Sequence, residues 1–263
     1  MSRPTVRELL DLKGVRQLSE VLVRTEDEAL ACEEAGIDLL ITVAGDQARK
    51  IRAAAPNTFL TMGILYGHCS SPTEAIKAGF AALNDGADAV YACMSIPFIE
   101  AMSNEGIPVV GHVGLVPQKR TWTGGFRAVG KTAEEALNVY QATADHQEAG
   151  AFAVEMEVVP FEVASEISKR MELLVISMGS GNGCDAQYLF AEDILGTNRG
   201  HVPRHAKVYR NLSSELDRIQ KERVQAFREY QADVLSGTFP GAGNTVKIKA
   251  NEYKEFLKNI PSY

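Results

Sequence analysis

Apolar residues along the chain fall into short runs of strand length, and several of these runs follow a glycine that ends a segment with helical spacing. A glycine at that point is typical of a left-handed helix C-cap, so the run after it is the next strand. Other runs rich in aliphatic and β-branched residues predict strands without such a glycine. The strands are predicted within 34–43, 84–94, 104–114 and 147–159, where the glycines are Gly36, Gly86, Gly106 and Gly150, and also at 19–25, 58–64 and 171–179.

Segments of helical periodicity separate the predicted strands. Ser71 and Thr132 precede acids at positions suited to helix N-caps. At least seven strands alternate with helices over about 180 residues, which favours a (β/α)8 TIM barrel over a doubly wound sheet. The active site of such a barrel is built at the C-terminal ends of its strands. The predicted helices are 25–35, 71–84, 131–149 and 160–170.

The last part of the chain has a different pattern from the barrel units. It predicts a long charged helix at 213–237, then a glycine-rich loop, and a last helix near Asn251 to Asn259. No linker or low-complexity segment divides the chain. We therefore expect a single (β/α)8 barrel domain over 1–263, with a C-terminal helical tail at about 211–263 that closes the barrel or contacts a neighbouring subunit.

Composition narrows the class of protein. The 263 residues carry a net charge of −7, and acids interrupt the longest basic clusters, so nucleic acid is not an expected partner. The four cysteines are widely scattered, which predicts reduced thiols. The N-terminal segment is charged where a signal peptide is apolar, and no uncharged apolar run approaches the roughly 18 residues of a spanning helix. We expect a cytoplasmic protein without a membrane partner.

The stretch AVEMEVVP, 153–160, places two acids in an otherwise apolar strand. Glu155 and Glu157 lie on one face, because side chains alternate along a strand. In one interpretation, an acid pairs with a cation of the outer helices, or the strand end is already in solvent. In the other, a carboxylate at the strand mouth acts as a base that removes a proton next to a carbonyl.

Two further segments are candidates for ligand contacts. His112 follows the apolar run IPVV, so it either bonds a ligand carbonyl or carboxylate or ties down its own loop. The segment GSGNG, 179–183, follows a strand and precedes a predicted helix start at Asp185, where backbone N–H groups can meet an anion. It has neither the dinucleotide fingerprint nor a P-loop.

Several of these segments together resemble ketopantoate hydroxymethyltransferases, also called 3-methyl-2-oxobutanoate hydroxymethyltransferases. The resemblance implies a barrel of the phosphoenolpyruvate/pyruvate superfamily type, a homo-oligomer, and a small 2-oxo acid substrate. The enolate of that substrate takes a one-carbon unit from 5,10-methylenetetrahydrofolate. The family's base falls on Glu157, and substrate contacts are expected from Tyr91, His112, Gln118 and Ser180. The motifs are GHVGLVPQ (111–118), EVVP (157–160), GSGNGCDAQ (179–187), GHVPRHAK (200–207) and SGTFPG (236–241), and the match is poor before about Gly106.

The family's metal positions have largely lost their charge in this chain. Asp46 matches the first magnesium aspartate only with a two-residue shift, and Gly63 stands at the second. Tyr91 and Cys93 replace a Lys-x-Glu pair that serves substrate and metal. A hard cation needs several oxygen ligands, so a site in which Asp46 is the only remaining metal aspartate is expected to bind Mg²⁺ poorly. The enolate and the substrate carboxylate then need other partners, for which the candidates are His112, the Tyr91 hydroxyl, the backbone of 179–183, Arg49 and His68.

Three hypotheses of function remain open at this point. The first is a hydroxymethyltransferase-like enzyme. The second is a lyase or retro-aldol enzyme that breaks a C–C bond of a 2-oxo acid through the same enolate without the usual metal site. The third is a non-catalytic barrel that binds a metabolite or a protein. Exchange of the proton next to the carbonyl separates the enzymes from the binding protein.

Overall fold

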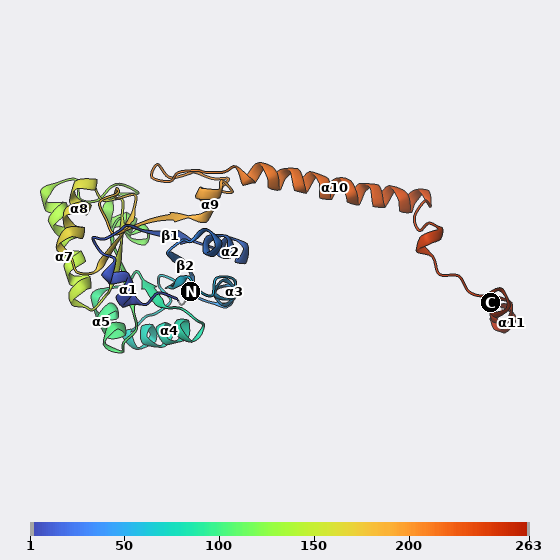
Figure 1. The fold of residues 1–263 in the computed structure, drawn as a ribbon, viewed down its shortest axis with the longest axis horizontal. Coiled ribbons are helices and arrows are strands. Elements are labelled where there is room, and N and C mark those ends of the chain that lie inside the picture. The colour runs from blue at the N-terminus through green and yellow to red at the C-terminus, as the bar shows by residue number, and fades with distance from the viewer. Residues whose placement is uncertain (1–2, 262–263) are drawn as a thin grey trace. The chain divides into compact units, whose positions relative to one another are not determined.

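A computed structural model describes residues 3–261, and its main feature is a closed barrel of eight parallel strands joined in sequence order (Figure 1). The last strand pairs with the first, which closes the sheet. The (β/α)8 prediction is therefore confirmed. The strands are β1 Leu18–Leu22, β2 Leu39–Val43, β3 Phe59–Ile64, β4 Ala89–Ala92, β5 Val109–Gly114, β6 Ala153–Glu157, β7 Leu174–Met178 and β8 Ala186–Phe190.

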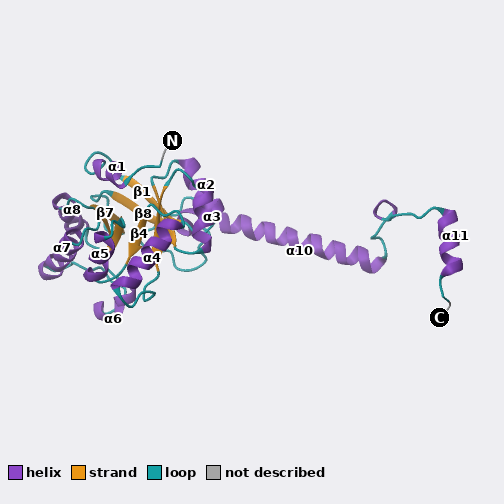
Figure 2. Cartoon of the chain, turned by 90° about the horizontal axis from the view of Figure 1, so that it is seen from below, coloured by secondary structure: helices purple, strands orange, loops and turns teal. Residues whose placement is uncertain are grey.

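Helices surround the sheet, as the view coloured by secondary structure shows (Figure 2). The four predicted helices are present, and Ser71 and Thr132 each accept a hydrogen bond from the backbone N–H of the third residue of the helix, as N-caps do. The barrel unit has helices α1 Val6–Asp11, α2 Glu26–Ala35, α3 Asp46–Ala54, α4 Pro72–Asn84, α5 Ile96–Asn104, α6 Arg120–Thr123, α7 Ala133–Glu148, α8 Phe161–Arg170 and α9 Ala191–Leu195, with one 3₁₀ turn, η1 Pro117–Lys119.

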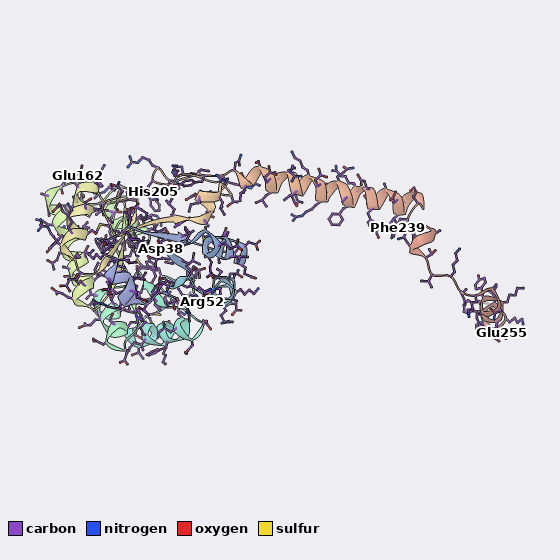
Figure 3. All side chains as sticks on the ribbon, viewed as in Figure 1. Asp38, Arg52, Glu162, His205, Phe239 and Glu255 are labelled. Carbon is purple, nitrogen blue, oxygen red and sulfur yellow. The ribbon has the colours of Figure 1, made fainter. Side chains whose placement is uncertain are left out.

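The barrel interior is apolar at one end and polar at the other. Leu18, Leu39 and Phe59 form a buried cluster near the N-terminal ends of the strands, and Leu9 of α1 packs against it. Outside the sheet, ion pairs fix the connections between helices and strands. Arg16 binds Asp38, and Arg52 binds Asp88, at 2.6 and 2.8 Å (Figure 3 labels Asp38 and Arg52). Apolar side chains thus fill the N-terminal end of the barrel, and the C-terminal end is the one that can hold a site.

The connection from β7 to β8 contains no helix, so the predicted helix start at Asp185 is wrong. The segment 179–185 runs back along the sheet, and β8 begins directly after it. It packs closely on α8, because a Cβ on Gly183 would lie 1.8 Å from Ser165 Oγ. Asp185 fixes its end by accepting hydrogen bonds from Lys13 Nζ at 2.6 Å and Ser168 Oγ at 2.9 Å. Glycines and a buried acid here replace a crossover helix.

The chain divides into two compact units after Arg210. The second unit consists of α10 Leu212–Ser236, a 3₁₀ turn at Ala242–Asn244 and α11 Ala250–Asn259, and no residue of these helices is buried. That both units form one domain stays a prediction. Over residues 3–261, no helix has the length and apolar character needed to cross a membrane. All four cysteines are free thiols.

Candidate active site

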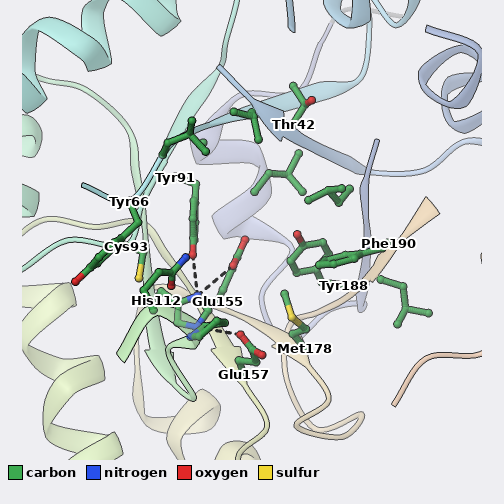
Figure 4. A pocket seen from close by; sticks show the side chains of 18 of the residues that line it. Thr42, Tyr66, Tyr91, Cys93, His112, Glu155, Glu157, Met178, Tyr188 and Phe190 are labelled. Carbon is green, nitrogen blue, oxygen red and sulfur yellow. Dashed lines mark hydrogen bonds and ion pairs between the residues drawn. The ribbon is translucent and has the colours of Figure 1, made fainter. Parts of the chain in front are cut away.

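A cavity of about 370 Å³ opens at the C-terminal ends of the barrel strands (Figure 4). Its volume lies in the range of small-molecule sites. Apolar side chains make up much of the wall, and a group of polar side chains converges from β4, β5 and β6. The polar lining includes Tyr91, His112, Gln118, Glu155 and Glu157. The site therefore lies at the end of the barrel where the fold predicts chemistry.

His112 is the centre of the polar group. Its Nε2 lies 2.8 Å from the carbonyl oxygen of Leu115 and 3.3 Å from Glu157 Oε2. Its Nδ1 lies 2.9 Å from the Tyr91 hydroxyl and 3.3 Å from Glu155 Oε2. The side chain is only 2% exposed. His112 thus ties down its own loop and also lines the cavity, and its bond to a ligand stays a prediction.

The surroundings favour a charged imidazole. Burial by itself lowers the pKa of His112, but hydrogen bonds to Glu155 and Glu157 outweigh that effect, so the net shift is well above its ordinary value. Burial raises the pKa of Glu155, and the hydrogen bond to His112 opposes the rise. Burial likewise raises the pKa of the Tyr91 hydroxyl. The directions of these shifts favour an imidazolium at His112 beside a neutral phenol at Tyr91.

Glu157 ends β6, and the backbone after it is held in an unusual conformation. Val158 has φ 51°, a left-handed geometry that a β-branched residue rarely adopts. Its N–H donates to the carbonyl of Met178 at 2.8 Å. The next N–H, of Val159, donates to Ser180 Oγ at 3.0 Å, and that hydroxyl donates to the carbonyl of Met156 at 2.8 Å. These bonds fix the direction in which Glu157 leaves the strand.

Ser180 therefore has a different place from the one predicted. It is 1% exposed, it is absent from the cavity lining, and both functions of its hydroxyl are used by the backbone on either side of Glu157. That Ser180 binds substrate stays a prediction, while its contacts in the structure position the Glu157 turn.

Glu20 on β1 is the residue that the sequence analysis missed. It is 3% exposed inside the barrel, on the same strand face as Leu18 and Leu22. Burial, and then the charge of Glu155, raise the pKa of Glu20 well above its ordinary value. The alternation that drew attention to Glu155 also applies to the run LSEVL, and it gives the signal that was available for Glu20.

Most of the predicted site residues meet at the cavity. Tyr91, His112, Gln118 and Glu157 line it, as do the residues at two of the family's metal positions, Gly63 and Cys93. Arg49 and His68 are not among the lining residues, and Arg49 binds Asp46 and Asp85 on the outside.

Asp46 does not reach the cavity. It begins α3, its side chain is 91% exposed, and it is ion-paired with Arg49. The two-residue shift needed to align it with the family aspartate moves it from the strand end into the first helical turn, so its side chain lies away from the cavity. Within residues 3–261, no three His, Cys, Asp or Glu side chains are arranged to hold a metal ion. The donor groups present do not fit Mg²⁺.

The space at the second metal position is filled by another side chain. A Cβ added to Gly63 would lie 3.3 Å from Cδ1 of the Tyr91 ring, closer than side chains normally approach. The ring then directs its hydroxyl to His112 (Figure 4). Gly63 and Tyr91 are thus complementary, since the missing side chain of one makes room for the other.

Two further ionisable side chains, those of His205 and Asp193, line the cavity. His205 packs over Gly179, whose φ is +72°, and burial lowers the pKa of His205 (Figure 3). Asp193 is 3% exposed and accepts a hydrogen bond from Asn198 at 2.7 Å. Among the described lining residues there is no lysine or arginine, so the side chains of the wall that can carry a positive charge are His112 and His205.

Comparisons with known proteins agree with the motifs. The family model described as ketopantoate hydroxymethyltransferase matches residues 33–242, so it extends well before Gly106. The chain is 30% identical to the 3-methyl-2-oxobutanoate hydroxymethyltransferase of Nitrosopumilus maritimus, over 98% of this chain and 99% of that protein. It is 35% identical to the enzyme of the same name from Deinococcus radiodurans, over 76% of this chain and 70% of that protein.

Solved structures agree on the fold. A phosphonopyruvate hydrolase in complex with oxalate and Mg²⁺ matches with a TM-score of 0.55 at 10% identity, over 97% of this chain and 98% of that one. A 2,3-dimethylmalate lyase, described as a member of the PEP mutase/isocitrate lyase superfamily, matches with a TM-score of 0.53 at 13% identity, over 96% of each chain. These likenesses agree with the (β/α)8 fold.

Proposed function

The chain belongs to the ketopantoate hydroxymethyltransferase family, and on that premise we propose that it transfers a hydroxymethyl unit to the enolate of a 2-oxo acid. The substrate is 3-methyl-2-oxobutanoate or a related carbonyl compound, and 5,10-methylenetetrahydrofolate supplies the one-carbon unit as the second substrate. Glu157 is the proton acceptor. Tyr91, His112 and Gln118 contact the 2-oxo acid.

The observation that carries this proposal is the placement of Glu157. It stands at the end of β6 in the cavity wall, 3.3 Å from His112 Nε2, on a turn whose backbone is fixed on both sides. A general base must be held where the proton leaves, and the locked turn supplies that constraint. The strained φ of Val158 is a conformation that persists only where the surrounding structure enforces it.

The chemistry follows from these positions. Glu157 takes the proton from the branch carbon next to the carbonyl, the C–H electron pair moves into the new C=C bond, and the carbonyl oxygen becomes an oxyanion. Hydrogen-bond donors aimed at that oxygen lower the barrier. The apolar part of the wall, with residues such as Ile41 and Met178, excludes water from the enolate until the one-carbon electrophile arrives.

Deuterium exchange at the branch carbon of 3-methyl-2-oxobutanoate tests the base. We expect Glu157→Gln to slow exchange and hydroxymethyl transfer by about 10²–10⁴, the usual contribution of a general base. The matched control is Glu166→Gln on α8, which removes an exposed acid that is paired only with Lys169 and Arg170. Exchange that is as fast in Glu157→Gln as in the wild type contradicts the assignment.

The same assay separates the other functions. A wild-type protein that exchanges the proton and cleaves a hydroxymethylated 2-oxo acid, but does not form one with folate, is a lyase. A protein that exchanges no proton from any 2-oxo acid is the binding protein.

We also propose a homo-oligomer. The support is α10, a helix of 25 residues with no buried residue, along which Leu216, Phe227, Tyr230 and Val234 are exposed apolar side chains. Such a face needs a partner surface. Light scattering on a size-exclusion column gives the mass, and a monomer at micromolar concentration contradicts the proposal.

A further inference from the structure

Three acidic side chains and one histidine form a connected group between the barrel interior and the cavity. Glu155 and Glu157 lie on either side of His112, and Glu20, buried inside the barrel, interacts electrostatically with Glu155. Two oxygen atoms of this group, Glu20 Oε2 and Glu155 Oε1, are buried and have no hydrogen-bond partner among the described residues. Buried polar atoms without partners are rare, and in a native structure they call for an explanation.

We propose that this group replaces the metal ion of the site: Glu155 holds His112 as a fixed imidazolium that stabilises the enolate, while Glu20 is a neutral acid in the barrel interior. The inference rests on the proposed function, because it concerns the charge that the enolate of the same reaction needs. It assigns roles to Glu20 and Glu155, two residues that lie outside the family motifs.

The first step of the argument is the loss of the metal position. Asp46 is outside the cavity, Gly63 has no side chain, and the Tyr91 ring occupies the space in front of it. Cys93 offers a thiol, a soft ligand that suits a hard cation poorly, and burial raises its pKa. An enolate still needs a positive or hydrogen-bonding partner.

The second step is the arrangement of protons on His112. Nε2 lies 2.8 Å from the Leu115 carbonyl, which only accepts, so Nε2 carries a proton. Nδ1 lies between the Tyr91 hydroxyl and Glu155 Oε2. If Nδ1 also carries a proton, it donates to these oxygens and Glu155 is an ordinary carboxylate. If Nδ1 is bare, it accepts from the Tyr91 hydroxyl, and its lone pair then faces Glu155 Oε2 at 3.3 Å, which disfavours an ionised Glu155.

The third step uses the groups that face His112 from each neighbouring element. They are Tyr91 from β4, Cys93 directly after β4, Glu155 and Glu157 from β6, and His146 from α7. The two carboxylates outweigh His146, whose pKa is lowered by burial. The balance therefore favours the cation on His112 over a protonated Glu155.

The fourth step concerns Glu20. Two carboxylates buried together in a barrel interior cannot both ionise readily, and Glu155 already has a cationic partner while Glu20 has none among the described residues. Glu20 is then the protonated member. A neutral Glu20 does not compete with Glu155 for the charge of His112.

The experiment follows the five histidines of the full-length protein by NMR with ¹³C-labelled histidine, using His112→Gln to assign the signal. We expect His112 to remain an imidazolium above pH 7 in the wild type. Glu155→Gln should lower its pKa by at least one unit, and Glu155→Asp should restore part of the shift. Glutamine has the shape and neutral charge of a protonated glutamate, so Glu20→Gln should leave the pKa of His112 unchanged.

Three outcomes overturn the inference. The first is a neutral His112 at pH 7 in the wild type. The second is a His112 pKa that Glu155→Gln does not move. The third is a fall in that pKa in Glu20→Gln, which would mean that Glu20 is ionised. If Glu155→Gln does not fold, the wild-type titration and Glu20→Gln still decide.

A second arm separates this inference from the proposed function. Deuterium exchange on 3-methyl-2-oxobutanoate should persist in excess EDTA, and calorimetric titration with Mg²⁺ alone should show no binding. Exchange that requires Mg²⁺ overturns the inference and leaves the transferase proposal standing. Absence of exchange under all conditions, together with the expected NMR result, overturns the transferase proposal and leaves the charge assignment of His112.

Discussion

Replacing Ser180 with alanine tests how the Glu157 turn is held. The change removes the hydrogen bond to the Met156 carbonyl and leaves the Val159 N–H without its acceptor. Ser180 is 1% exposed, so water does not readily replace either bond. One lost bond and one buried unpaired donor together cost about 2–4 kcal/mol of unfolding free energy. For a barrel of this size, that corresponds to roughly 5–15 °C in melting temperature.

Thermal and urea unfolding of Ser180→Ala measure this cost, and steady-state kinetics measure its effect on the turn. We expect a lower kcat with little change in KM, because the residue positions Glu157 and does not touch substrate. Ser103→Ala is the matched control, since the buried hydroxyl of Ser103 has no hydrogen-bond partner among the described residues. It should change stability by less than about 0.5 kcal/mol. Unchanged stability of Ser180→Ala with a raised KM would refute this reasoning and return Ser180 to substrate binding.

Three further predictions concern residues outside the cavity. Asp46→Asn should leave kcat/KM unchanged with and without EDTA, because its side chain is 91% exposed and pairs only with Arg49; a loss of activity in steady-state assays would restore it to the site. Asp185→Ala should lower the unfolding free energy in urea by about 3–5 kcal/mol, because it leaves Lys13 largely buried without its partner; a loss below 1 kcal/mol would contradict this. Glu135 has its pKa lowered to about 2, first by the hydrogen bond from Arg127, so its stabilisation is complete above the unfolded pKa near 4.5 and is lost as the pH falls towards 2. Glu135→Gln should therefore flatten the melting temperature against pH between 4.5 and 2, and an unchanged slope would show that the pair does not contribute.

The periodic features of the fold were predictable because they are local. Helix caps such as Ser71 and Thr132 depend on a few neighbouring residues, and the strands follow from short apolar runs. The connection from β7 to β8 was not predictable in this way. Its form depends on Gly183 packing against Ser165 and on Asp185 binding Lys13, contacts between residues that are distant in the sequence.

The candidate site also contains residues that local sequence could predict and residues whose roles depend on distant contacts. Alternation and family motifs led to Glu157 and His112, because both belong to contiguous segments. The role of Glu20 depends on closure of the barrel, which brings β1 near β6 across the interior. The place of Ser180 depends on a bond to the neighbouring strand end, 21 residues away. Sequence spacing cannot distinguish a hydroxyl that meets substrate from one that meets backbone.

The fit between Gly63 and Tyr91 makes a single step back towards a metal site unfavourable. An aspartate at position 63 would first meet the aromatic ring, since even its Cβ would lie 3.3 Å from Tyr91 Cδ1. Removing the ring first would deprive His112 of the hydroxyl 2.9 Å from its Nδ1 before any metal ligand was in place. We expect each intermediate to function less well than either end state, which is the situation known as reciprocal sign epistasis. Variants of this protein that are selected for magnesium-dependent activity should therefore acquire changes at positions 63 and 91 together.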